Sequence, residues 1–185
     1  MTLFATARSL LFVRADRPER FDKALNSGAD GVIIDLEDAV APSAKPAARA
    51  ALSDWLETAK ADNICVRIND VAHTDHDLDL ALAAHPNVHA VMLPKADSAT
   101  RCCAVAAATN KPILALIETA QGLTAAHEIA TAPVVSRLVL GTIDLALDLG
   151  IDGAIEHGVS LLDHARATLT VASRAAGISA PVDGV

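Results

Sequence analysis

Two acidic residues stand at positions where a buried site could use them. Glu118 directly follows the apolar segment Ile113–Ile117, and Asp144 comes three residues after Gly141, which ends another apolar segment. If these segments are neighbouring parallel strands, the two carboxylates meet at one edge of the sheet, and carboxylate oxygens are ligands that Mg2+ prefers. The alternative is that each acid only stabilises the start of the following helix. Spacing alone leaves both interpretations open.

A cation and further acids follow two more apolar segments. Arg67 ends the segment ICVR, where its guanidinium could hold a substrate carboxylate through two parallel hydrogen bonds or could pair with a nearby acid. Glu37 and Asp38 follow GVIIDL, and so much negative charge beside apolar residues requires a counter-charge. Lys45, Lys95 or a metal ion could supply it. An ion-pair network without chemistry is the competing interpretation.

The segment His73–Asp79 resembles a metal cluster, because histidine and aspartate alternate along it. Residues two apart do not share a helix face, and acids are favoured in the first turn of a helix, so we interpret this segment as a helix start. The three cysteines, Cys65, Cys102 and Cys103, have neither zinc-site spacing nor an even number. Structural zinc and disulfides are therefore disfavoured.

Short β-branched segments alternate with longer Ala-rich segments, which is typical of βα units that build a parallel sheet. The expected strands are Leu10–Val13, Gly31–Leu36, Ile64–Asn69, Ala90–Pro94, Ile113–Ile117, Arg137–Gly141 and Ile178–Asp183. No GxGxxG follows the first of them, which argues against a dinucleotide-binding open sheet. Charged residues follow most of the strands, as the active site of a (β/α)8 barrel requires. The pattern therefore favours an α/β barrel.

The composition describes one soluble globular domain over residues 1–185. The chain is 52% hydrophobic and carries a formal net charge of −8. That charge would repel a phosphate backbone, and three Phe and one Trp offer few rings for base stacking, so we expect no nucleic-acid partner. No apolar run approaches the roughly 20 residues that cross a bilayer. No secretory signal is recognisable either, so we expect no membrane partner and a cytoplasmic location.

Six motifs occur in a fixed order between Arg8 and Gly150. They are RSLLFV with DRPERFDKAL, GADGVIIDLEDAV, RIN, VMLPKAD, ALIETAQGL and GTIDLALDLG, and APVDGV follows near the end. By these motifs the chain resembles the HpcH/HpaI aldolase/citrate lyase family, which includes the citrate lyase β-subunit.

The resemblance implies a (β/α)8 TIM barrel that cleaves or forms a carbon–carbon bond in a hydroxyacyl-CoA with the help of Mg2+. Glu118 and Asp144 then become the metal ligands, and Arg67 binds the carboxylate of the keto acid. Glu37 and Asp38 lie around the metal, through water. The leading reaction is cleavage of citryl-CoA to acetyl-CoA and oxaloacetate, with malyl-CoA-type substrates next. The alternatives are a class II aldolase for a hydroxy-keto acid and a non-catalytic partner subunit that binds Mg2+ and a keto acid.

The chain departs from the family pattern in three places. Arg14-Ala15-Asp16 stands where a small turn such as Pro-Gly-Asp is usual, although Arg14 and Arg17 are candidates for contacting CoA. A Gly-Thr pair that is frequent in the family is absent after Asn69. The sequence ends at Val185, so we expect a barrel without strand eight and the C-terminal lid region, either a fragment or a shortened member. The resemblance also implies a homo-oligomer, a trimer or a hexamer.

Overall fold

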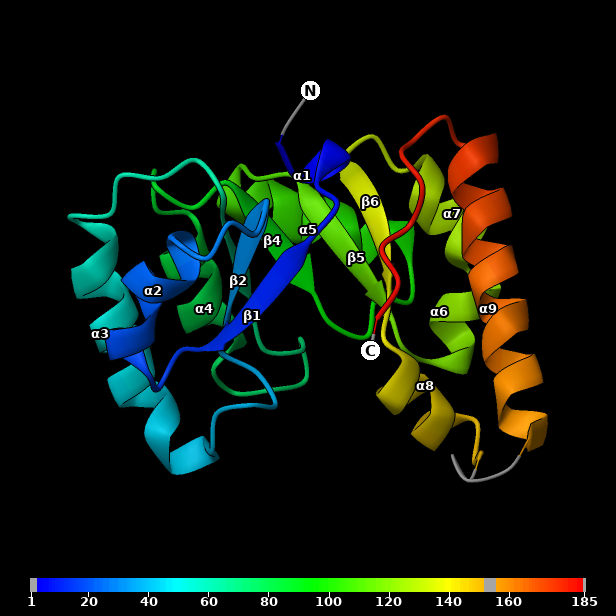
Figure 1. The fold of residues 1–185 in the computed structure, drawn as a ribbon, viewed down its shortest axis with the longest axis horizontal. Coiled ribbons are helices and arrows are strands. Elements are labelled where there is room, and N and C mark those ends of the chain that lie inside the picture. Colours follow the sequence, from blue (N-terminus) through cyan, green and yellow to red (C-terminus); the bar gives the residue numbers. More distant parts are fainter. Residues whose placement is uncertain (1–2, 152–155, 185) are drawn as a thin grey trace.

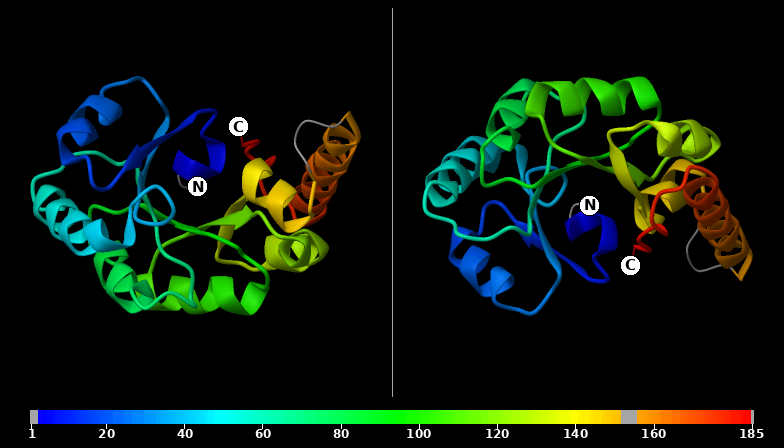
Figure 2. Two further views of the ribbon diagram at one scale, coloured as in Figure 1. Left: turned by 90° about the horizontal axis from the view of Figure 1, so that it is seen from below. Right: turned by 90° about the horizontal axis from the view of Figure 1, so that it is seen from above.

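The fold is a curved parallel sheet with helices along its outer face (Figures 1 and 2). The computed structural model describes residues 3–151 and 156–184. The sheet contains six strands in the order β1-β2-β3-β4-β5-β6, and every neighbouring pair is parallel. The strands are β1 (Leu10–Arg14), β2 (Gly31–Asp35), β3 (Ile64–Arg67), β4 (Ala90–Leu93), β5 (Ile113–Ile117) and β6 (Val135–Leu140). This sequential order, with helical crossovers, is that of a barrel wall and confirms the predicted α/β class.

The helical segments are α1 (Leu3–Thr6), η1 (Pro18–Arg20), α2 (Phe21–Leu25), η2 (Pro42–Ala44), α3 (Lys45–Leu56), α4 (His76–Ala83), α5 (Ala99–Thr109), α6 (Ala120–Thr124), α7 (Ala126–Thr131), α8 (Thr142–Asp148) and α9 (Glu156–Ala175). Helix α1 precedes β1, the segments from η1 to α7 connect successive strands, and α8 and α9 follow β6. None of the helices in the described ranges is long and apolar enough to cross a membrane.

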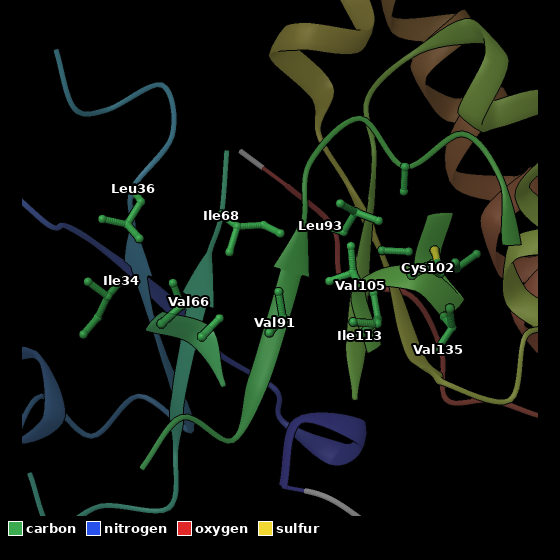
Figure 3. Packing of buried hydrophobic residues seen from close by; sticks show 14 of the residues in the cluster. Ile34, Leu36, Val66, Ile68, Val91, Leu93, Cys102, Val105, Ile113 and Val135 are labelled. Atoms are coloured by element: carbon green, nitrogen blue, oxygen red, sulfur yellow. The ribbon is translucent and has the colours of Figure 1, made fainter. Parts of the chain in front are cut away.

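Side chains on the outer face of the sheet form the larger hydrophobic core. Ile34, Val66 and Val91, from three successive strands, belong to the same buried cluster as Cys102 and Val105 of α5 (Figure 3). Both faces of the sheet are covered, which explains why the strands are continuous apolar runs without polar alternation.

The inner face of the sheet forms a second, smaller core. Ile33, Cys65, Met92 and Leu114 of β2 to β5 cluster with Phe4 of α1, and all five side chains are fully buried. Helix α1 lies at the amino ends of the strands on the inner side of the curve (Figure 2). The N-terminal segment thus fills the interior of the barrel at the end opposite to α8.

The predicted seventh strand, Ile178–Asp183, is wrong as a strand. Only Val182 pairs with the sheet, through an isolated parallel bridge to Val139. Its amide donates to the carbonyl of Leu138 at 3.0 Å, and its carbonyl accepts from Leu140 at 2.9 Å. Alternate residues of a strand face one neighbour, and the carbonyl of Ala180, two residues before Val182, accepts from Nε of the Arg137 side chain at 2.6 Å. Within the described residues the sheet therefore stays open between β1 and the segment around Val182.

We predict that Phe4→Ala lowers the free energy of unfolding by about 3 kcal/mol, because it leaves a cavity among the inner-face side chains. Urea unfolding followed by circular dichroism measures the change. Leu3→Ala is the matched control, since Leu3 belongs to the same helix and is 36% exposed. An equal, small effect of both substitutions would contradict a structural role for α1.

Candidate active site

Six charged side chains gather at the carboxyl ends of β2 to β6. They come from the last residue of β2, the segment after it, the last residue of β3, the turn after β4, the residue after β5 and the first turn of α8. These residues are Asp35, Glu37, Arg67, Lys95, Glu118 and Asp144. The parallel sheet brings all of these strand ends to one edge, as in the active sites of barrel enzymes.

Arg67 is held by two acids from β2 and the segment after it. Its Nε and Nη2 atoms donate to the two carboxylate oxygens of Asp35 at 2.7 and 2.6 Å, and its Nη1 lies 3.0 Å from Oε2 of Glu37. The guanidinium also stacks 5.2 Å from the centre of the Phe12 ring. Burial opposes the charge, yet the hydrogen bonds and charge of Asp35 raise the pKa of Arg67 above its ordinary value. Arg67 therefore stays positively charged, with its side-on edge occupied by Asp35.

The pairing of Arg67 with an acid is one of the two possibilities that the sequence left open. Asp35 and Arg67 are directly paired across β2 and β3, so both side chains leave neighbouring strands at the same level. Asp35 has no role among the sequence-based expectations. A signal for it exists, because an acid and an arginine lie near the carboxyl ends of two successive predicted strands.

Glu37 is buried between two cations. Its Oε1 accepts from Nζ of Lys95 at 2.7 Å, whereas its Oε2 accepts no aligned hydrogen bond despite lying close to Arg67. Burial raises the pKa of Glu37, and the charges of Arg67 and Lys95 act against that rise. Asp38 lies at the exposed edge of the site, with a side chain that is 58% exposed and 3.8 Å from Lys95. Of the two predicted acids, only Glu37 is therefore enclosed by the site.

Lys95 connects Glu37 to Glu118. Its backbone amide donates to Oε1 of Glu118 at 2.9 Å, while its ammonium binds Glu37. Its φ angle is +47°, in the left-handed region that non-glycine residues rarely adopt. Such strain concentrates at functional sites. Lys95 thus contacts Glu118, a candidate metal ligand, through its backbone amide and Glu37 through its side chain.

Glu118 is almost completely enclosed. A Cβ atom at Gly141 would lie 2.8 Å from Oε2 of Glu118 and 2.7 Å from its Cβ, so only glycine fits beside this carboxylate. Burial raises the pKa of Glu118 to about 8, the nearby charges of Glu37 and Asp144 contribute to the rise, and the amide of Lys95 partly offsets it. A buried carboxyl group with this pKa binds a cation readily, because the cation neutralises the charge that burial disfavours.

The site opens into a cavity of about 410 Å3. Arg67, Glu118 and Asp144 line it together, and Leu116, Val139 and Val182 supply apolar walls. Among the described residues, no group of three or more His, Cys, Asp or Glu side chains could hold a metal ion. Two carboxylates with water completing the shell suit Mg2+, which keeps several water ligands in most protein sites.

Of the two predicted CoA-contacting arginines, Arg14 is paired with Asp35 across β1 and β2, but its guanidinium binds a different acid. Arg14 donates to both carboxylate oxygens of Asp16, at 2.9 and 2.6 Å, and Nη1 of Arg17 is 3.6 Å from Glu19. Both arginine side chains are 51% exposed. Arg14 ends β1, so these cations flank the same end of the sheet as the acids.

The segment His73–Asp79 has a structural role in the first turn of α4 and the turn before it. Asp79 is fully buried and accepts from the backbone and side-chain amides of Asn69, and Nδ1 of His76 lies 2.8 Å from the carbonyl of Asn69. Lys45 joins this network. Its buried ammonium donates to the carbonyls of residues 36 and 37 and to Asn69, so it supports the backbone that carries Glu37 and does not pair directly with an acid.

Together, the fold and the acid-rich cluster define a barrel-type α/β protein with a polar site at the carboxyl ends of its strands. A family model described as HpcH/HpaI aldolase/citrate lyase matches residues 8–185. The chain belongs to the HpcH/HpaI aldolase/citrate lyase family.

Curated relatives extend beyond the present sequence. A citrate lyase subunit beta-like protein of Mycobacterium tuberculosis is 40% identical over 183 residues, covering 96% of this chain and 64% of the relative. A (3S)-malyl-CoA thioesterase of Cereibacter sphaeroides is 40% identical over 146 residues, covering 77% of this chain and 51% of the relative. The chain thus spans less than two thirds of the length of either relative.

Solved structures from M. tuberculosis share the fold. The citrate lyase beta subunit complexed with oxaloacetate and magnesium has a TM-score of 0.86 and 39% identity, and the match covers 99% of this chain and 80% of that one. The protein CitE in complex with magnesium, acetoacetate and coenzyme A has a TM-score of 0.84 and 38% identity, with coverage of 97% and 66%.

The pKa of Glu118 predicts how stability depends on pH when no divalent metal is present. The folded state holds a proton on Glu118 up to about pH 8, whereas the unfolded chain releases it near pH 4.3. The free energy of unfolding therefore falls as pH rises between these values. Urea unfolding in EDTA at pH 5 and pH 9 will show a larger decrease for the wild type than for Glu118→Gln. Equal decreases would contradict the burial of an ionisable group at this position.

Proposed function

We propose that the protein is a Mg2+-dependent carbon–carbon lyase that cleaves a short hydroxyacyl-CoA, with citryl-CoA as the first candidate and a malyl-CoA-type substrate as the second. The observation that carries the proposal is the shared cavity in which Arg67, Glu118 and Asp144 face one space. An anion-binding cation and two oxygen ligands are the groups that a hydroxy acid and its metal require.

Glu118 and Asp144 would hold the ion, with Glu37 and Asp38 around it through water. The donor set fits, because all four are hard oxygen ligands and Glu37 has a buried oxygen without an aligned hydrogen bond. Bound Mg2+ would act as a Lewis acid on the substrate oxygens. Magnesium accompanies oxaloacetate, acetoacetate or pyruvate in solved relatives, which supports this proposal.

Arg67 would bind and orient the carboxylate next to the reacting carbon. Asp35 occupies the Nε and Nη2 hydrogens along the side-on edge. A substrate carboxylate is left with the end-on edge between Nη1 and Nη2, where two parallel N–H groups can bind both of its oxygens. Fixing the acid in this way aligns the carbon–carbon bond with the metal ligands on the other side of the cavity.

In the proposed reaction, the substrate hydroxyl loses its proton and its carbon becomes the ketone of oxaloacetate. The bond between this carbon and the carbon next to the thioester breaks, and its electron pair passes to the thioester enolate. A proton then converts the enolate to acetyl-CoA. Exposed Arg14 and Arg17, beside the same end of the sheet, are the proposed contacts for the CoA phosphates.

Thioester hydrolysis is the second candidate, since one relative is named (3S)-malyl-CoA thioesterase. The two reactions have different products from the same substrate. Lysis of malyl-CoA gives acetyl-CoA and glyoxylate, whereas hydrolysis gives free CoA and malate.

We further propose that the protein acts in the cytoplasm as a homo-oligomer, a trimer or a hexamer, which light scattering after size-exclusion chromatography can test.

We predict Mg2+-dependent cleavage of citryl-CoA or malyl-CoA that is at least 100-fold slower in Glu118→Gln, because losing an outer-shell partner of a metal already costs roughly 10- to 100-fold and Glu118 would be a ligand itself. Mass spectrometry of the products, with and without EDTA, measures it. Glu57→Gln is the matched control, because the side chain of Glu57 is 71% exposed on the far end of α3.

Release of free CoA would favour the thioesterase. Binding of Mg2+ and oxaloacetate without turnover would leave a binding subunit, and turnover of a hydroxy-keto acid without CoA would indicate an aldolase.

A further inference from the structure

Two cations compete for the buried carboxylate of Glu37. Lys95 binds Oε1 at 2.7 Å with good geometry, and Arg67 lies 3.0 Å from Oε2 without an aligned hydrogen bond. The acid therefore sits beside the guanidinium but is directed toward the ammonium. This arrangement leaves Nη1 of Arg67 near a carboxylate that does not fully engage it.

The neighbourhood of Lys95 fixes this arrangement. The left-handed backbone at Lys95 points its amide to Glu118, on the neighbouring strand end, so the start of the lysine side chain is anchored. From that anchor the ammonium reaches Glu37 first and Asp38 only at 3.8 Å. No other described cation forms an ion pair with Glu37 besides Arg67.

We propose that Lys95 is a positioning residue that holds Glu37 away from the end-on edge of Arg67 and so keeps that edge available for the carboxylate of a keto acid. This inference rests on the proposed function of Arg67. Without the ammonium, Arg67 is the one described cation at ion-pair distance from the buried carboxylate of Glu37, and a buried charge turns to such a partner. Glu37 would then align with Arg67 and compete with the ligand.

The test is calorimetric titration of oxaloacetate at Mg2+ concentrations that saturate each variant. Lys95→Met should weaken oxaloacetate binding roughly tenfold, the typical effect of one hydrogen bond between charged groups. Lys95→Arg should retain the affinity, because it keeps a cation beside Glu37. Lys60→Met controls for the loss of one positive charge, since Lys60 is exposed and lies before β3, at the opposite end of the strand.

The decisive variant is the double substitution Lys95→Met with Glu37→Gln. A neutral glutamine cannot compete for Arg67 as a carboxylate does, so oxaloacetate affinity should return to within about threefold of Glu37→Gln alone. An effect of Lys95 that does not pass through Glu37 would not be repaired by changing Glu37. Unchanged affinity in Lys95→Met, or no recovery in the double variant, would overturn the proposal.

A crystal structure of Lys95→Met supplies a readout that needs no ligand. We expect Oε2 of Glu37 to accept an aligned hydrogen bond from Nη1 of Arg67, and Glu37 left in its present position would overturn the proposal. If the wild type fails to bind oxaloacetate while Glu37 turns to Arg67 in this variant, the proposed function fails and the positioning role of Lys95 stands.

Discussion

The bidentate ion pair between Arg67 and Asp35 is the interaction on which the rest of the site depends. It joins the last residues of two adjacent strands, at 2.6 and 2.7 Å, in a place from which water is largely excluded. Breaking such a pair by removing one partner would leave an unpaired buried charge, which is strongly unfavourable. Because Arg67 and Asp35 hold each other in place, Glu37 and the cavity wall pack around a guanidinium group with a fixed position.

Backbone contacts, as well as charge, set the positions of the other acids, Glu118 and Glu37. The amide of Lys95 holds one oxygen of Glu118, and the missing side chain of Gly141 leaves room for the other. The ammonium of Lys45 donates to the carbonyls of residues 36 and 37 and so supports the backbone at Glu37. The result is a preorganised set of oxygens whose mutual repulsion a divalent cation would relieve, which is the electrostatic basis of the proposed metal site.

The sequence predicts much of this arrangement because parallel strands have simple rules. Continuous apolar runs locate β1 to β6. Charged residues at or shortly after the carboxyl ends of parallel strands share one edge of the sheet, so the sequence alone could place Glu118, Asp144 and Arg67 near one another. The turn at Lys95 could not be anticipated, since a left-handed lysine has no sequence signature and depends on the contact with Glu118. The seventh strand fails because the Arg137 side chain binds the carbonyl of Ala180 and only Val182 pairs with β6, which local β propensity does not reveal.

If Glu118 and Asp144 form one metal site, loss of the Asp144 carboxylate must weaken Mg2+ binding, which isothermal titration calorimetry of the wild type and Asp144→Asn measures. Asp163→Asn is the control, because the Asp163 side chain is 65% exposed on α9. We expect one Mg2+ per chain in the wild type and in the control, and at least tenfold weaker binding in Asp144→Asn. Equal Mg2+ affinity in all three proteins would contradict it.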